Sequence, residues 1–167
     1  MTSTDGPGPS PEDIGAVLRG AFTQTPLHQL LGLRFVDDGA TSSTVVIEMP
    51  VAAPAFNGSG NLHGGAIATL VDVAAGSCAG RASGFDPLRQ SLVTADLHVR
   101  YLGRPKGDPV RAEARLIRTG RMLIVVEVRV LDPLDNLVAV ADFSAMVVAR
   151  REPLAGAIPT DPRGPDL

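Results

Sequence analysis

Several features are scarce in this chain of 167 residues, and each scarcity excludes a class of protein. The single cysteine leaves no disulfide framework and no cysteine-rich zinc site, so nothing indicates secretion. Fifteen basic residues against eighteen acidic ones do not favour binding to nucleic acid or to an anionic membrane. No apolar run approaches the ~20 residues of a membrane span, and the N-terminus lacks the pattern of a signal peptide. We therefore expect a cytoplasmic protein.

What the chain does have is enough apolar sequence to fill one core. Hydrophobic residues make up 44% of the chain and charged residues 20%, which is typical of a globular protein. Seven of the fourteen prolines lie in the end segments 1–11 and 153–165. We expect flexible tails over 1–10 and 152–167, and a single domain over 11–151.

Hydrophobic periodicity predicts helices and two strands in the first half and four strands in the second. Residues 63–82 are rich in alanine, free of proline and apolar on nearly every face, which predicts a helix that is buried all round. Helical spacing also predicts a helix near 11–22 and a short turn at 26–31. A period of two predicts strands, which are expected at 33–36, 44–49, 93–101, 110–116, 122–130 and 137–148. Short turns favour antiparallel pairing, so we expect an α+β fold with one central helix wrapped by an antiparallel sheet.

An acidic residue stands in the middle of the apolar helix. Asp72 follows Leu70 and Val71 and precedes Val73 and Ala74. An unpaired carboxylate in such surroundings costs several kcal/mol or stays protonated. Asp72 therefore faces a solvated groove, has a structural partner, or carries out chemistry.

A glycine-rich loop, residues 57–65, runs into the same helix. Paired glycines at a helix start leave backbone N–H groups unobstructed, and the helix dipole adds partial positive charge there. Such a place can hold a phosphate or polarise a carbonyl oxygen, and it can also be an ordinary turn. The spacing matches neither a dinucleotide-binding fingerprint nor a P-loop.

Taken together, the loop and the acid resemble the hotdog-fold acyl-CoA thioesterases, in particular their PaaI-type (phenylacetate-pathway) branch. The matching residues are Asn57, Gly60, His63, Gly64, Gly65 and Asp72. The segment 93–102 also resembles the strand that follows the helix in that family. The resemblance covers roughly residues 26–149 and implies a hotdog fold.

The resemblance also implies roles for individual residues. Asp72 would act as general base on water or as nucleophile, and the Gly64 N–H would polarise the thioester carbonyl. Asn57 would hold the attacking water or the thioester, and Thr94 would be a hydrogen-bonding helper. His63 and Gly65 would shape the substrate-binding loop. No cofactor is implied, because coenzyme A is part of the substrate.

Four basic residues lie in presumed turns of the second half: Arg104, Lys106, Arg118 and Arg121. They are either solvated surface charges or partners for the phosphates of coenzyme A. No residues have the spacing of a metal site, and we expect neither His28 nor His98 to be a ligand. Cys78 is expected to be a small buried hydrophobic residue.

The spacing of the two main candidates bears on assembly. Gly64 and Asp72 are eight residues apart, about 12 Å along a helix, so one small thioester carbonyl cannot touch both. If both act, they come from different chains, and the active site lies at the interface of a homo-oligomer. We expect a dimer, or a homotetramer built as a dimer of dimers. The alternating polar residues of the strand after the helix would suit this interface: Thr94, Asp96, His98 and Arg100.

Two other functions remain open at this point. One is a hotdog dehydratase or hydratase acting on acyl thioesters, and the other is a non-catalytic module that binds acyl-CoA. The acyl group, the choice between coenzyme A and acyl carrier protein, and the role of Asp72 as base or nucleophile also remain open.

Overall fold

The computed structural model describes residues 11–37, 43–87 and 89–151, so the tails expected at 1–10 and 152–167 lie outside the described residues. The helices, a 3-10 turn and two short strands lie in the first half of the chain, and four longer strands make up the second. The elements are α1 (Pro11–Gln24), α2 (Pro26–Leu30), β1 (Arg34–Asp37), β2 (Thr44–Met49), η1 (Ala53–Ala55), α3 (Gly64–Ser83), β3 (Gln90–Tyr101), β4 (Val110–Thr119), β5 (Ile124–Leu131) and β6 (Leu137–Ala149).

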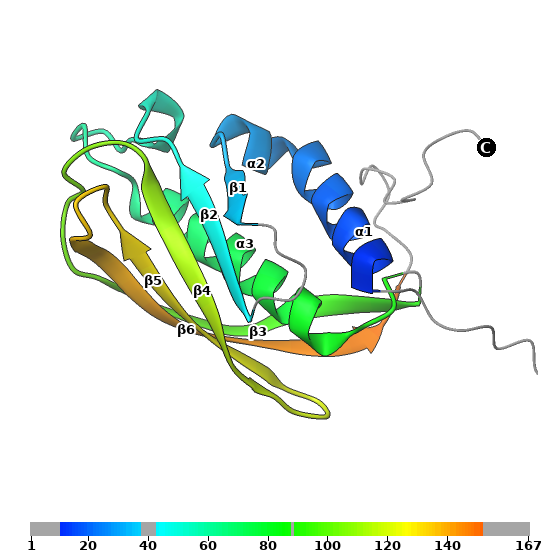
Figure 1. Ribbon diagram of the computed structural model, residues 1–167. Helices are drawn as coiled ribbons and strands as arrows, with labels where there is room; N and C mark the ends of the chain where they lie inside the picture. The colour runs from blue at the N-terminus through cyan, green and yellow to red at the C-terminus, as the bar shows by residue number, and fades with distance from the viewer. Residues whose placement is uncertain (1–10, 38–42, 88, 152–167) are drawn as a thin grey trace, which may run out of the picture.

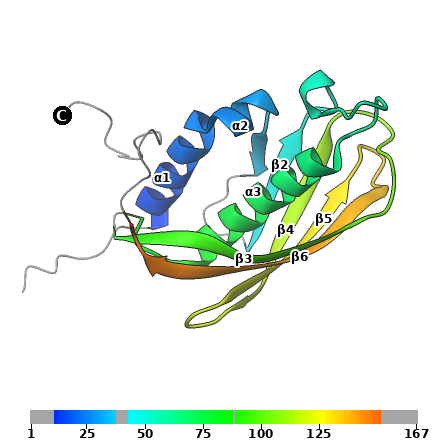
Figure 2. The same ribbon diagram turned by 180° about the vertical axis from the view of Figure 1, so that it is seen from behind.

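The described strands form one six-stranded sheet in the order β1-β2-β4-β5-β6-β3. Every neighbouring pair is antiparallel. The sheet curves around α3, which lies along its concave face, while α1 and α2 lie on the far side of α3 (Figures 1 and 2). The predicted α+β arrangement of a central helix wrapped by an antiparallel sheet is therefore confirmed.

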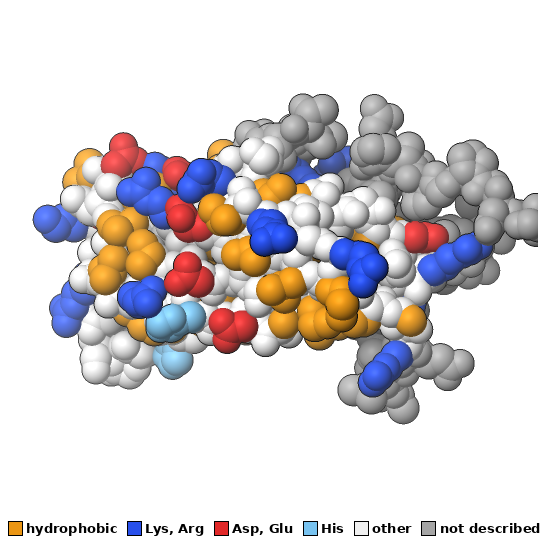
Figure 3. All heavy atoms as spheres, turned by 90° about the horizontal axis from the view of Figure 1, so that it is seen from below, with side chains coloured by type: hydrophobic (Ala, Val, Ile, Leu, Met, Phe, Trp, Pro, Cys, Tyr) orange, Lys and Arg blue, Asp and Glu red, His pale blue; other side chains and the backbone are white. Residues whose placement is uncertain are grey.

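The outer face of the sheet carries charged side chains of both signs between scattered apolar ones (Figure 3). Some of these charges pair across neighbouring strands, as Arg100 does with Asp142 at 3.3 Å and Arg115 with Glu127 at 3.6 Å. Each strand consequently has one apolar and one mixed face, which explains the period of two in the sequence. In the described part of the chain, no helix is long and apolar enough to span a membrane.

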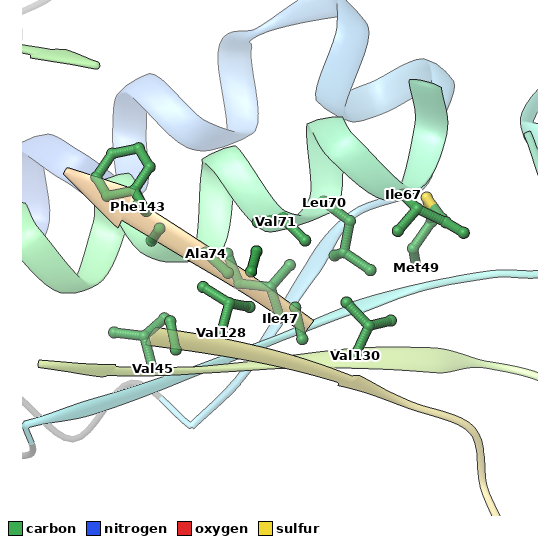
Figure 4. Packing of buried hydrophobic residues seen from close by; sticks show 14 of the residues in the cluster. Val45, Ile47, Met49, Ile67, Leu70, Val71, Ala74, Val128, Val130 and Phe143 are labelled. Atoms are coloured by element: carbon green, nitrogen blue, oxygen red, sulfur yellow. The ribbon is translucent and has the colours of Figure 1, made fainter. Parts of the chain in front are cut away.

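The core lies between α3 and the concave face of the sheet. Ile47 of β2 and Val128 of β5 point toward Leu70 and Ala74 of α3 (Figure 4), and all four side chains are buried. Alanines on the helix allow it to lie close to the branched side chains of the strands. Truncating a large residue here, such as Leu70→Ala, is expected to cost about 2–5 kcal/mol because a cavity remains.

One stripe of α3 is less buried than the sequence indicates. The prediction of a helix buried all round is wrong for the single chain, because a stripe along α3 is only half-buried. Its members are Ala68, Thr69, Asp72, Val73, Gly76 and Ser77. These residues recur at helical spacing, so they share a side of α3 that the sheet covers only in part. Asp72 lies in the middle of this stripe.

β3 contains a bulge that divides its two faces. Thr94 lies opposite Ala145 and Asp96 opposite Ser144, so β3 has one extra residue between them. Leu97 and Val99 pack against the core, whereas Arg100 pairs with Asp142 on the outer face. The prediction that Thr94 shares one polar face with Asp96, His98 and Arg100 is therefore wrong: Thr94 faces the helix, because a bulge reverses the alternation.

Candidate active site

The start of α3 is capped by a histidine. His63 precedes the first helical residue, and its Nδ1 accepts a hydrogen bond of 2.8 Å from the Gly65 N–H. The His63 N–H donates to the carbonyl of Ala55 at 2.7 Å, which ties the loop to η1. A Cβ on Gly65 would lie 2.9 Å from His63 Nδ1, so any other residue would force the His63 side chain to shift and disturb the cap. His63 therefore shapes the loop, as the resemblance implies, and its position favours glycine at position 65.

Gly64, the first residue of α3, is held against the end of β3. The hydroxyl of Tyr101 donates to the Gly64 carbonyl at 3.0 Å, and a Cβ on Gly64 would lie 3.4 Å from the Tyr101 ring. Within residues 11–37, 43–87 and 89–151, the Gly64 N–H donates to no protein acceptor. An N–H at a helix start that lacks a protein partner is suited to bind an oxygen that carries partial negative charge.

Asn57 organises the loop before the helix. Its Oδ1 accepts hydrogen bonds from the N–H groups of Ser59 at 3.0 Å and Asn61 at 3.1 Å. The Asn57 N–H donates to the Asn61 carbonyl at 2.8 Å, so the loop closes on itself. The side-chain oxygen is thus occupied, and only the amide Nδ2 could contact water or a thioester. The role expected for Asn57 at the substrate stays a prediction.

Asp72 is paired with the residue expected to help it. The Thr94 hydroxyl donates to Asp72 Oδ1 at 2.9 Å, which joins the middle of α3 to β3. The carboxylate is half-buried, and it therefore does not carry the full desolvation cost of a buried, unpaired charge. Its second oxygen, Oδ2, makes no hydrogen bond to the described residues and could accept a proton or attack.

β3 is the strand that touches both candidates, and it lies at an edge of the sheet. Among the strands that the structure describes, it pairs only with β6, so its other side presents backbone groups with no described strand beside them. Apolar side chains at this edge are exposed, by 47% for Val93, 54% for Tyr101 and 55% for Leu102. Such an edge is a place where another strand can pair.

The four basic candidates fall into two groups. Arg104 and Lys106, the loop pair, follow β3 and lie at the Gly64 end of α3, where Tyr101 contacts Gly64. Arg118 and Arg121, the hairpin pair, lie where β4 turns into β5. All four side chains are exposed.

The hairpin pair lies far from Gly64 in the same chain. The N–H of Leu116 and the Sγ of Cys78 both donate to the carbonyl of Ser43, which places the base of the hairpin beside Cys78. Cys78 lies about 21 Å along α3 from Gly64. Burial raises the pKa of this thiol to about 11, which agrees with the expected structural role of Cys78. The four basic residues therefore do not form one site in a single chain.

A buried carboxylate that the sequence did not single out holds the backbone of the loop at Lys106. Asp132, just after β5, is fully buried and accepts hydrogen bonds from the backbone N–H groups of Lys106, Leu134 and Asn136. Burial alone raises its pKa, but hydrogen bonds from the Asn136 side chain and these N–H groups outweigh that effect and lower the pKa to about 2. No sequence pattern predicts the hydrogen bond between Lys106 and Asp132, because the two residues come together only in the folded chain.

No group of three or more His, Cys, Asp or Glu residues in the described ranges is placed to hold a metal ion. The arrangement that can do chemistry is therefore a carboxylate with a hydroxyl partner on α3 and a backbone N–H at the start of the same helix. Such groups suit attack of an oxygen nucleophile on a polarised carbonyl.

Comparison with known proteins agrees with this geometry. A family model described as the thioesterase superfamily matches residues 59–139. A Halobacterium salinarum protein named "Putative esterase VNG_1336C" is 31% identical over 128 residues, which cover 75% of this chain and 82% of that protein. A thioesterase family protein from Silicibacter pomeroyi has a TM-score of 0.71 at 21% identity, covering 82% of this chain and 99% of the other. The E. coli PaaI protein from the phenylacetic acid degradation operon has a TM-score of 0.66 at 19% identity, covering 80% and 94%.

The fold and these similarities define a hotdog-fold protein of the thioester hydrolase class. The chain belongs to the thioesterase superfamily. The resemblance seen in the sequence is thereby confirmed at the level of family and fold.

Proposed function

We propose that the protein hydrolyses the thioester of an acyl-CoA to the free acid and coenzyme A. One observation carries the proposal. Asp72, held by Thr94 at 2.9 Å, lies on the same helix whose first N–H, that of Gly64, has no protein partner among the described residues. A carboxylate and an oxyanion donor are the two groups that thioester hydrolysis needs most.

The chemistry follows from these two groups. The Gly64 N–H binds the thioester oxygen, and Asp72 takes a proton from a water molecule whose oxygen attacks the carbonyl carbon. The tetrahedral intermediate carries its negative charge on the oxygen at Gly64. The C–S bond then breaks, the proton passes from Asp72 to the sulfur, and the products are a carboxylic acid and a thiol. In the nucleophilic alternative, Asp72 attacks the carbonyl itself, and the C–S bond breaks to release the thiolate. Water then hydrolyses the resulting anhydride, which restores the Asp72 carboxylate, yields the acid and supplies the proton that the thiolate takes up.

The site needs two chains. Gly64 and Asp72 are about 12 Å apart along α3, too far for one carbonyl. Antiparallel pairing of β3 with β3 of a second copy keeps both α3 helices on one face of a continuous sheet. The two helices then lie side by side in opposite directions, and the half-buried stripe around Asp72 is covered. Gly64 of one chain thereby approaches Asp72 of the partner subunit. Association of two such dimers into a tetramer stays a prediction.

The same symmetry gives both basic groups a place in the proposal. The loop pair lies near Gly64 of its own chain, whereas the hairpin pair lies at the opposite end of α3. When two helices run in opposite directions, the hairpin pair of one chain lies at the same end as Gly64 of the partner subunit. We therefore assign the loop pair to the near phosphates of coenzyme A and the hairpin pair to the far side of the same entrance.

Release of free thiol tests the proposed function. A panel of acetyl-, hexanoyl-, benzoyl- and phenylacetyl-CoA is compared for wild type and for Asp72→Asn, which keeps the shape of the side chain. We expect the variant to lose 10²–10⁴-fold in rate, the range typical of a lost general base. Asp142→Asn is the matched control, because Asp142 lies on the outer face of the sheet in an exposed ion pair. That control should keep its rate and its melting temperature to within the small effect of a surface pair.

The outcomes separate the candidates. A dehydratase or a non-catalytic binding module predicts no thiol release by wild type. If Asp72→Asn keeps its rate, or if it loses its rate only because it unfolds, Asp72 is not the reacting group. A single turnover in H₂¹⁸O provides a positive test of the nucleophilic route, because the label enters the Asp72 side chain only when water hydrolyses an anhydride at the Asp72 carbonyl.

A further inference from the structure

The peptide unit between Gly64 and Gly65 is held at both of its polar groups. Its N–H donates to His63 Nδ1 at 2.8 Å, and its carbonyl accepts from the Tyr101 hydroxyl at 3.0 Å. The preceding peptide unit is held as well, because the His63 carbonyl accepts from Ala66 N–H at 3.0 Å and Ile67 N–H at 3.1 Å. Gly64 is the joint between these two fixed units.

Without these hydrogen bonds, the backbone would rotate freely about Gly64. Glycine has more backbone freedom than any other residue, and two glycines follow one another here. The first turn of a helix also lacks partners inside the helix for its N–H groups. The Gly64 N–H belongs to the peptide unit that Ala66 and Ile67 hold through the His63 carbonyl, and this unit keeps its orientation only if the Gly64–Gly65 unit beside it is fixed as well. Tyr101 is the contact that comes from outside the helix and its own cap.

We infer that Tyr101 is a positioning residue for the Gly64 N–H. The inference rests on the proposed function, in which that N–H binds the thioester oxygen. The hydroxyl of Tyr101 fixes the first turn of α3, and its ring, 3.4 Å from the Cβ position of Gly64, closes one side of the joint. An oxyanion donor is effective when it is already oriented before the charge develops, so loss of this contact lowers kcat more than it raises KM.

The contact also links the donor to the edge strand. Tyr101 is the last residue of β3, the strand with an open edge, and Thr94 of the same strand holds Asp72. One strand therefore positions both proposed reacting groups. Pairing of this edge with a second copy would order the strand at the place where the site is assembled.

Tyr101→Phe tests the inference, because it removes one hydroxyl and keeps the ring on an exposed side chain. We expect kcat for hexanoyl-CoA to fall about two- to tenfold, the range of one net hydrogen bond, with little change in KM. Thr23→Val is the matched control, since it removes a hydroxyl that bonds the Gly20 carbonyl at 3.0 Å within α1, away from the candidate site. That variant should keep kcat within twofold.

Two further readouts separate positioning from simple support of the fold. The first is amide hydrogen exchange in ¹⁵N-glycine-labelled protein, where exchange at Gly65 should become faster in Tyr101→Phe. This measurement needs no substrate. The second is the carbonyl stretch of benzoyl-CoA bound to Asp72→Asn, where the shift to lower frequency caused by the donor should shrink when Tyr101→Phe is added. A merely structural role would lower the melting temperature and leave this frequency unchanged.

The inference fails if glycine exchange is unchanged in Tyr101→Phe. It also fails if exchange is faster but both kcat and the carbonyl frequency stay at wild-type values while Asp72→Asn abolishes turnover. Failure of the proposed function looks different: wild type then releases no thiol from any member of the panel, and the exchange measurement alone decides whether Tyr101 holds the helix start.

Discussion

Substituting Gly64 by proline removes the proposed oxyanion donor and very little else. Proline has no backbone N–H, and it is favoured at the first position of a helix because its fixed φ suits that position. His63 precedes it with φ −70° and ψ 132°, the extended conformation that a residue before proline requires. Gly64→Ala is the matched control, because alanine adds the same Cβ and keeps the N–H.

The size of the effect follows from what each variant changes. Loss of one oxyanion donor typically lowers kcat by 10²–10³, and we expect this for Gly64→Pro. The added Cβ lies 3.4 Å from the Tyr101 ring, an ordinary van der Waals contact, so Gly64→Ala should fold. Replacing glycine by alanine within a helix stabilises it by roughly 0.5–1 kcal/mol. Gly64→Ala should therefore keep kcat within a few-fold and melt at or above the wild-type temperature.

Thiol release by both variants, with a thermal melt of each, makes the comparison. Equal losses of kcat in Gly64→Pro and Gly64→Ala would refute the reasoning, since steric disturbance rather than the N–H would then be responsible. Mixing Gly64→Pro with Asp72→Asn after joint refolding tests the shared site. Random pairing makes half of the dimers mixed. In each mixed dimer, Asp72 of the Gly64→Pro chain meets Gly64 of the other chain, so one of the two sites is intact. About a quarter of wild-type activity should therefore return. A site within one chain predicts no recovery.

Three further predictions concern the surroundings of the site. His63→Ala should lower the free energy of unfolding by about 0.5–2 kcal/mol in urea, and His63→Asn should restore most of it, because asparagine also caps helices; equal losses in both would mean that the cap contributes nothing. The pKa of Asp132 is lowered in the folded chain from 3.8 to about 2, so its contribution is present above pH 4 and is lost as the pH falls from about 4 to 2; Asp132→Asn should lower the melting temperature at pH 7, with a gap that narrows toward pH 2, and a gap independent of pH would contradict this. Alanine substitution of the loop pair should raise KM for acyl-CoA without lowering kcat, and an unchanged KM would place the phosphates elsewhere.

The order of elements and the segments that form the candidate site could be predicted from the sequence because they depend on local patterns. Alternation predicts the strands, and the glycine-rich loop with an acid nine residues after His63 predicts the start of the helix and its carboxylate. The structure keeps the predicted order of elements and shifts their boundaries by a few residues, as with β3, which begins at Gln90. The expected oligomer and cytoplasmic location stay predictions.

What could not be predicted depends on contacts between distant segments. Tyr101 looks like one more apolar residue of its strand, and its hydroxyl gains a role only where β3 ends beside Gly64. The half-buried stripe of α3 could not be predicted from the number of apolar residues, since alanine and glycine occur on both buried and half-exposed faces of a helix. Likewise, the two basic groups look equivalent until the direction of the β4–β5 hairpin is known.

The bulge in β3 identifies the position at which this strand can best lose a residue. Thr94 is tied to the acid on α3 and Tyr101 to the start of that helix, and the two anchors lie on opposite sides of the extra residue near Ala95. Ala95 has no paired residue in β6, although the strand is held on both sides of it, at Thr94 and at Tyr101. A chain lacking Ala95 would keep Thr94 opposite Ala145 and Asp96 opposite Ser144, so this is the position in β3 where a deletion is least disruptive. When related strands of unequal length are aligned, Thr94 and Tyr101 should accordingly be matched first, and the gap should be placed at Ala95.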